Sequence, residues 1–295
     1  SATEQNVIFA LLMFGLGILV GLWPFHTWAP LGYSAAPTAT AMMHAGVIKK
    51  FGLFMLIKVA LPLLPEGAQT WLPILALLCL GNILYCGLVA MRQKDLNLLI
   101  GNSSVAHMGF VFLGIASVTT IGLTGAVMVM VAHGLLAGLA FGLSGYLYSQ
   151  ARTLDMEKLQ GLLASMPFWG TLMIMALMAG CGLPGFANFA GELTVFFGAW
   201  KMYPVITTIG IWSALVIGAV YMLRAIRTLL HGMKGEQTPE VEDLKHWQRL
   251  PYALLVAVLL LFGFYPKLIT DKISKSNATF EQAKKGQTPT EEATE

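Results

Sequence analysis

Charged residues are scarce in this sequence. Only 11% of its 295 residues are Asp, Glu, Lys or Arg, whereas 56% are hydrophobic. Soluble domains carry about 25% charged residues, so this composition excludes that class of protein. The mean hydropathy of +0.70 indicates instead a polytopic helical membrane protein. The formal net charge of +3 is too small to argue for binding to nucleic acid.

The sequence also has few residues of the kinds that hold cofactors. Its three cysteines all lie in apolar runs without the spacing of metal ligands: Cys79, Cys86 and Cys181. It contains no Gly-rich phosphate loop after a strand, no haem-type cysteine motif and no recognisable nucleophile triad. We therefore expect no cofactor, no metal site and no chemistry catalysed by this chain alone.

Long apolar runs predict eight membrane spans. They cover residues 7–28, 38–61, 71–91, 96–117, 121–149, 166–200, 204–223 and 251–265. We expect residues 1–269 to form one all-α transmembrane bundle, and residues 270–295, which are rich in Lys, Glu and Thr, to form a polar tail. Lysines and arginines gather in the loops at one end of this predicted bundle. The positive-inside rule places those loops in the cytoplasm and both termini on the opposite face.

The sixth apolar run, residues 166–200, is too long for one straight crossing of a bilayer. Pro184, flanked by Gly182 and Gly185, cannot continue a helix, so we expect a break there. Broken backbone inside a membrane persists only where it is buried in protein or lines a water-filled cavity. Glu192 follows the proline in the same run, and a carboxylate at that depth is a functional candidate. The alternative is a glutamate held in a structural salt bridge.

Other ionisable groups lie near the middle of predicted spans. Lys49 and Lys50 are too deep to reach water easily, and adjacent side chains of a helix point about 100° apart, so at least one must face protein or water. His107 and His133 are central in the fourth and fifth runs. A lone buried histidine is more often a hydrogen-bonded core residue than a proton carrier. Lysine, two histidines and Glu192 on different helices, one of them broken, are together typical of a proton relay.

Several stretches resemble the antiporter-like proton-pumping subunits of respiratory complex I and its relatives. They are residues 23–30 (WPFHTWAP) with 36–38, 44–50 (HAGVIKK), 103–109 (SSVAHMG) and 182–192 (GLPGFANFAGE). These stretches occur in the order found in that family and extend over nearly the whole chain. The glutamate that follows the glycine in the last stretch is similar to the M-type subunit.

This resemblance implies roles for individual residues. Lys50 would be the bridging lysine, His107 and His133 the central relay, and Glu192 the terminal residue of the distal half-channel. The family fold is a bundle of fourteen helices with two inverted five-helix repeats, each containing one broken helix. The eight spans of this chain would match the family from its seventh helix onward, including the second repeat.

Two departures from the family accompany the resemblance. The first repeat is mostly missing from this sequence, so we expect a separate polypeptide or an upstream segment to pack against residues 7–61. The family also has a central lysine in its first broken helix where this chain has Leu19, and a proline where it has Gly21. Because leucine cannot carry a proton, the chain is either part of a split subunit or has lost that half-channel. We expect the surroundings of Leu19 to be dry.

The resemblance implies a proton-translocating membrane-arm subunit of a complex I-like NADH-quinone oxidoreductase in the bacterial inner membrane. Redox chemistry in partner subunits would drive proton movement, and membrane lipids would surround the chain. One alternative is a subunit of a multi-subunit cation/proton antiporter or of an ion-coupled bicarbonate uptake system. Another is a degenerate scaffold subunit, which Leu19 favours and the four ionisable residues disfavour.

Overall fold

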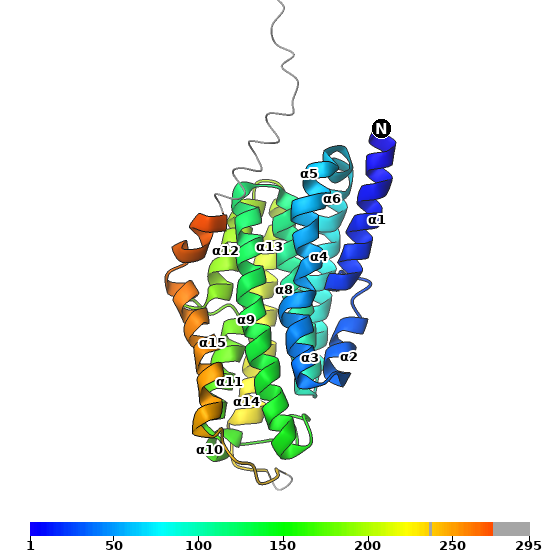
Figure 1. Ribbon diagram of the computed structural model, residues 1–295. Coiled ribbons are helices and arrows are strands. Elements are labelled where there is room, and N and C mark those ends of the chain that lie inside the picture. The colour runs from blue at the N-terminus through cyan, green and yellow to red at the C-terminus, as the bar shows by residue number, and fades with distance from the viewer. Residues whose placement is uncertain (236–237, 274–295) are drawn as a thin grey trace, which may run out of the picture.

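The computed structural model describes residues 1–235 and 238–273, and the regular elements in these ranges are all helices. They stand side by side as one elongated bundle (Figure 1). Six continuous helical segments of this described part are long and apolar enough to cross a membrane. The expected all-α membrane bundle is therefore confirmed. The predicted polar tail lies mostly outside the described residues.

The eight predicted spans correspond in order to helices of the bundle. Their bounds are α1 (Ala2–Val20); α3 (Thr38–Met43), η1 (His44–Ile48), α4 (Lys50–Met55), η2 (Leu56–Ala60) and α5 (Leu61–Leu63); α6 (Pro65–Leu80), η3 (Gly81–Cys86) and α7 (Gly87–Arg92); α8 (Leu96–Ser117); α9 (Thr120–Ala151); α11 (Pro167–Gly180) and α12 (Ala187–Ala199); α13 (Pro204–Trp212), η4 (Ser213–Gly218) and α14 (Ala219–Leu230); and α15 (His246–Phe264). Two short helices, α2 (Trp28–Ala35) and α10 (Leu162–Ser165), lie in connections.

The first span ends earlier than the hydropathy predicted. Helix α1 stops at Val20 because Gly21 adopts φ 94°, a left-handed conformation that favours glycine and closes a helix. The chain then turns through residues 21–27 before α2 begins. The predicted end of this span at residue 28 is therefore wrong.

The second span is a helix interrupted by two π segments, η1 and η2. In η1 the backbone N–H of Lys49 donates to the carbonyl of His44, five residues earlier, at 3.2 Å. Such wide turns inside α-helices occur frequently at functional sites. The sixth span contains the predicted break, between Gly180 and Ala187, and its existence is confirmed.

The seventh span extends beyond its predicted end at residue 223. Helix α14 continues to Leu230, so Arg224 and Arg227 belong to the helix. The described residues of the connection to α15, 231–235 and 238–245, contain no helix. The short helix α10 and this connection lie at the end of the bundle opposite the N-terminus (Figure 1).

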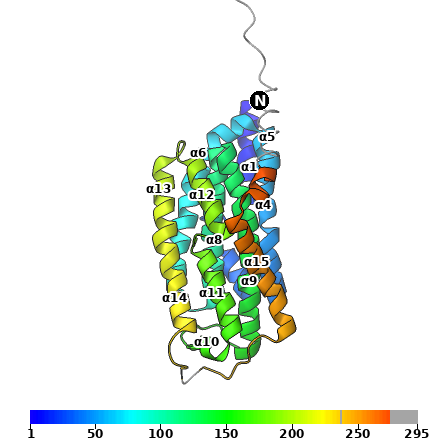
Figure 2. The same cartoon turned by 90° about the vertical axis from the view of Figure 1, so that its left-hand side faces the viewer.

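Helices α8 and α9 form the centre of the bundle. In the most apolar 18-residue stretch of each helix, 94% of the residues of α8 are buried, compared with 22% in α1 and 11% in α15. The last two stand at opposite edges, as the two perpendicular views show (Figures 1 and 2). The polar residues of α8 are therefore shielded on all sides, whereas the edge helices expose apolar side chains such as Leu11 and Leu254.

Glycines bring two neighbouring elements against α9. A side-chain carbon at Gly125 would lie 2.5 Å from the backbone nitrogen of Val195, so α12 packs directly on the α9 backbone. On another side of α9, Gly134 meets the carbonyl of Gly46 in η1, where an added carbon would lie 2.9 Å from that oxygen. Small residues allow such close approach of helices in membranes. They place the polar residues of α12 and of the second span within reach of α9.

Candidate functional site

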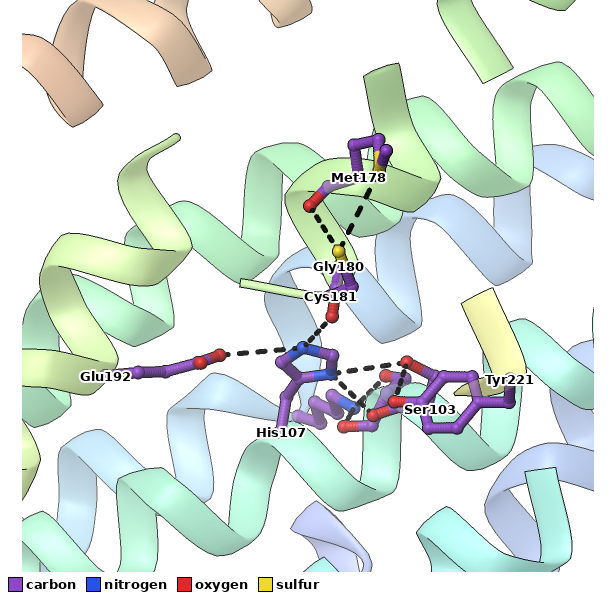
Figure 3. Close-up of polar contacts among 9 residues, drawn as sticks. Ser103, His107, Met178, Gly180, Cys181, Glu192 and Tyr221 are labelled. Atoms are coloured by element: carbon purple, nitrogen blue, oxygen red, sulfur yellow. Dashed lines mark hydrogen bonds and ion pairs between the residues drawn. The ribbon is translucent and has the colours of Figure 1, made fainter. Parts of the chain in front are cut away.

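The site begins at the break between α11 and α12. Gly182 and Gly185 adopt φ angles of 71° and 104°, and Pro184 lies between them. This break leaves the carbonyl of Gly180 without a helical N–H partner from the following turn. His107 of α8 uses it instead, with Nε2 3.0 Å from the carbonyl oxygen (Figure 3).

His107 is placed between two carbonyl oxygens. Its Nδ1 lies 2.7 Å from the carbonyl oxygen of Ser103, while Nε2 faces Gly180. A carbonyl oxygen only accepts, and a neutral imidazole has one N–H, so the neutral ring satisfies one side at a time and the protonated ring satisfies both. The arrangement can therefore hold either form of the ring and pass a proton from one face to the other.

Glu192 lies on the Nε2 side of His107. Its Oε1 is 3.6 Å from that nitrogen, and the side chain of Glu192 is almost fully buried. The close packing of α12 on α9 holds the carboxyl group there, since Gly191 lies directly on the backbone of Val129. The glutamate predicted from the sequence thus points at the predicted histidine (Figure 3).

His133 and Lys50 extend the site on the other side of His107. The two imidazole rings have centroids 5.5 Å apart, and Nδ1 of His133 lies 3.0 Å from Nζ of Lys50. That ammonium group also donates to the carbonyl of Ala45, within the π segment η1. The structure therefore brings all four predicted residues into one buried row, which runs from Lys50 through His133 and His107 to Glu192.

Two small cavities flank His107. One, of about 20 Å³, is lined by Ser103, Ser104, His107, His133 and apolar residues of α9 and α11. The other, also about 20 Å³, is lined by His107, Gly180, Cys181, Glu192, Tyr221 and apolar residues of α8 and η4. Each volume is large enough for the centre of one water molecule, and both are lined by polar groups. A proton can thus be carried on either side of the ring by a water molecule.

Two further polar residues of the site were missed in the sequence. The hydroxyl of Tyr221 in α14 lies 3.1 Å from Oγ of Ser103 (Figure 3). Asn188 lies one turn before Glu192 and is fully buried, and its side-chain nitrogen and oxygen hydrogen-bond to no group among the described residues. Asn188 stands inside the stretch GLPGFANFAGE, which was the available signal. Tyr221 had none, because a tyrosine in an apolar run is also typical of packing.

Lys49 is a second buried cation beside the row. Its Nζ donates to the carbonyl oxygen of Ser104 at 3.2 Å and to Oγ of the same residue at 2.5 Å. Both adjacent lysines are therefore buried, where the sequence required at least one to face protein or water. No group of three or more His, Cys, Asp or Glu in the described ranges is placed to hold a metal ion.

Comparisons with known proteins agree on the kind of fold. The profile of a family described as NADH:quinone oxidoreductase/Mrp antiporter, TM, matches residues 1–218. The chain is 35% identical over 280 residues to NAD(P)H-quinone oxidoreductase chain 4 1 of a Picosynechococcus species, which covers 90% of this chain and 52% of the relative. It is 33% identical over 275 residues to NADH-quinone oxidoreductase subunit M of Rhodobacter capsulatus, with coverage of 93% and 54%. The chain thus spans about half the length of these curated relatives.

Solved structures contain the same arrangement of helices. A chain of respiratory complex I from Thermus thermophilus superposes with a TM-score of 0.87 at 28% identity, over 95% of this chain and 59% of that one. A chain of the membrane-bound sulfane sulfur reductase, an archaeal respiratory membrane complex, gives 0.86 at 24% identity, over 97% and 58%. A chain of the Mrp complex from a Dietzia species gives 0.82 at 17% identity, over 95% and 62%. The last two likenesses concern the fold alone.

Proposed function

The chain belongs to the NADH:quinone oxidoreductase/Mrp antiporter transmembrane family, and on that premise we propose that it conducts protons in the membrane arm of a complex I-like NADH-quinone oxidoreductase. The single observation that carries this proposal is the buried row of four ionisable residues. These residues come from four separate helical elements, and each lies next to the following one through the centre of the bundle: Lys50, His133, His107 and Glu192. Charged groups at such depth are rare and mark ion or proton paths.

Each contact in the row supports one proton transfer, and together the transfers form a cycle. The Nζ–H bond of Lys50 breaks and an N–H bond forms at Nδ1 of His133, 3.0 Å away. The proton then passes to His107 by way of the cavity that both rings line. On the far side the Nε2–H bond of His107 breaks, and the carboxylate of Glu192 takes the proton across 3.6 Å or through a water molecule in the second cavity. Glu192 then releases the proton to water, and the next proton reloads Lys50, so every group is returned to its starting state.

We propose that redox chemistry in partner subunits supplies the driving energy for this path. We propose that these are other membrane-arm subunits of a multi-subunit complex in a bacterial inner membrane, surrounded by lipid. We include the expectation that further protein packs against residues 7–61, where α1 is mostly uncovered within this chain. An assembled complex in which that face meets only lipid would remove this part of the proposal.

Purification in mild detergent separates this proposal from its alternatives. We expect iron–sulfur and quinone-site subunits to copurify with the chain. Copurification of transporter subunits alone would favour a cation/proton antiporter or a bicarbonate uptake system. A complete oxidoreductase whose pumping ignores every residue of the row would identify the chain as a scaffold.

Substitution of Glu192 tests the proposed path directly. Glu192→Gln keeps the shape of the side chain but cannot ionise, whereas Glu192→Asp keeps a carboxylate on a shorter arm. In sealed vesicles, at matched electron-transfer rate, we expect Gln to lower proton pumping by at least about tenfold, because a positioned proton-transfer group typically contributes about 10²–10⁴-fold, and Asp to retain a substantial part.

The matched control is Glu66→Gln, the same chemical change at an exposed glutamate in the first turn of α6. It should leave pumping unchanged. Full pumping by the Glu192→Gln complex would refute the proton-carrier role. Failure of that variant to assemble, with normal assembly of the control, would support the structural salt bridge instead.

A further inference from the structure

Lys49 and Lys50 are neighbours in the chain but contact different helices. Lys50 faces His133 of α9, whereas Lys49 faces Ser104 of α8. The π segment η1, which ends immediately before Lys49, widens the turn and reduces the angle between successive side chains. Both amino groups are thereby directed into the protein. The backbone distortion thus adds a second cation to the centre of the bundle.

No carboxylate among the described residues pairs with Lys49 to balance the charge of its protonated form. The residue is fully buried, and no ion pair in the described part of the chain includes it. Its polar contacts are the carbonyl and hydroxyl of Ser104, and the ring of Tyr33 lies 5.6 Å from Nζ. Burying a cation without a partnering carboxylate destabilises a protein by several kcal/mol. A packing role is served better by an apolar residue, so the lysine calls for another explanation.

A polar hollow lies beside the segment that joins α2 to α3. It has a volume of about 560 Å³ and is lined by Ser34, Thr38, Asp95, Asn97, Tyr148 and neighbouring residues. Thr38 and Tyr148 are exposed there. We call it the vestibule. It is roomy enough for several water molecules and has the polar partners that they need.

Tyr33 is next in the chain to a residue of the vestibule and also lies near Lys49. It precedes the vestibule residue Ser34, and its ring centroid is 5.6 Å from Nζ of Lys49. Its hydroxyl is buried and hydrogen-bonds to no described group. A phenol hydroxyl both donates and accepts, so it can join water of the vestibule to the amine. Its unpartnered hydroxyl makes Tyr33 the candidate link between the two.

We propose that Lys49 is a second proton-carrying lysine, loaded from the vestibule past Tyr33 and discharged toward the imidazole pair through the cavity lined by Ser104. This inference rests on the proposed function. The Nζ–H bond of Lys49 breaks, and the proton passes by water in that cavity to His133 or His107. The neutral amine then takes a proton from vestibule water. Because two adjacent ammonium groups repel, loading of Lys49 also promotes release from Lys50.

Three substitutions of Lys49 distinguish a carrier from a structural cation. Lys49→Met removes the amine and should lower pumping at least about tenfold. Lys49→Arg keeps a cation that cannot lose its proton, and it should lower pumping as strongly. Lys49→His can titrate and should retain part of the rate. Each is measured in sealed vesicles of the assembled complex at matched electron-transfer rate, with Lys58→Met near the end of the same run as the control.

Pumping at the parent rate in Lys49→Met or Lys49→Arg would overturn the inference, the latter because a structural cation suffices. If both variants fail to assemble, Tyr33→Phe decides, since it removes only a hydroxyl. A slower pumping rate in Tyr33→Phe supports entry through the vestibule, and an unchanged rate overturns it. Glu192→Gln is measured in parallel. Full pumping there refutes the proposed function itself, whereas loss there with full pumping in the Lys49 variants refutes only the second lysine.

Discussion

Two breaks in the described helices, one after α1 and one between α11 and α12, leave backbone groups that are satisfied in different ways. Between α1 and α2, Asn82 of η3 satisfies the freed backbone: its Nδ2 donates to the carbonyl of Gly21 at 2.8 Å, and its Oδ1 accepts from the N–H of Trp23 at 2.8 Å. Between α11 and α12, the carbonyl of Gly180 accepts from the imidazole of His107, and Glu192 lies beside it. An amide satisfies the freed backbone groups of the first break, whereas an imidazole with a neighbouring carboxyl group does so at the second.

This difference shows that a helix break in a membrane is not by itself a proton site. A break supplies unsatisfied carbonyl and N–H groups, and these are satisfied by whichever polar side chain lies opposite. Asn82 has no proton to give at any ordinary pH, so it stabilises the backbone without being able to carry a proton. Leu19, half-buried in the last turn of α1, adds nothing ionisable there. Its dry surroundings remain a prediction that ordered water at Leu19 would contradict.

The largest expected difference between the two breaks comes from exchanging a histidine for glutamine at each of them. His107→Gln keeps polar contacts but cannot carry a proton between the two cavities, so pumping should fall at least about tenfold. His26 lies in the first break with its ring packed edge-on against Tyr85, 5.5 Å between centroids. His26→Gln should therefore pump at the parent rate. Both are measured in sealed vesicles of complexes that assemble equally, and an equal loss in both would erase the distinction between the breaks.

A smaller effect, on stability and not on transport, is expected at Asn82. Asn82→Leu leaves the buried carbonyl of Gly21 and the part-buried N–H of Trp23 without their partner. Each unsatisfied buried group costs about 1–3 kcal/mol, so thermal unfolding in detergent should begin at clearly lower temperature.

The control for this change is Asn102→Leu. It removes one hydrogen bond to the carbonyl of Leu98 within α8 and should lower the unfolding temperature less. Pumping per assembled Asn82→Leu complex should stay near the parent value. A complex of normal stability that no longer pumps would place Asn82 in the proton path and contradict this account of the first break.

The residues alone permitted prediction of the second break, whereas only the resemblance pointed to the first, and the reason is physical. Pro184 between two glycines forbids a continuous helix locally, so the second break needs no knowledge of the fold. At the first, Gly21 ends α1 by adopting φ 94°, and glycines in apolar runs usually continue a helix in a membrane. Its partner Asn82 is distant in sequence, and no local pattern indicates such a contact.

Prediction of the site succeeded where a residue was out of place in its surroundings. Lysine, histidine and glutamate inside apolar runs are conspicuous, and the structure places Lys50, His133, His107 and Glu192 together, although their roles as carriers remain predictions. The π turn that buries Lys49 beside Lys50 was not predictable, because it depends on packing against neighbouring helices. The role of Asp243 was not predictable either, because its carboxylate accepts hydrogen bonds from the first N–H groups of α11, which is distant in the sequence.

The smallest effect is expected at a polar contact outside both breaks, which serves as the reference for the other two. Lys94 Nζ and Glu157 Oε2 lie 2.9 Å apart, and both side chains are exposed. The hydrogen bond and charge of Glu157 raise the pKa of Lys94 above its ordinary value. A raised lysine pKa gives stability that is fully present below the unfolded value of about 10.4 and is lost only as pH rises through the folded value.

The contribution of this pair should therefore be constant between about pH 6 and pH 9. It should also be small, because solvent and salt screen exposed ion pairs. We expect Lys94→Gln to unfold within experimental scatter of the parent in detergent at pH 7 and at pH 9, in low and in high salt, and to pump normally. A fall in unfolding temperature as large as that of Asn82→Leu would mean that surface pairs stabilise this bundle as strongly as the buried amide. The contrast between the two breaks would then no longer rest on burial.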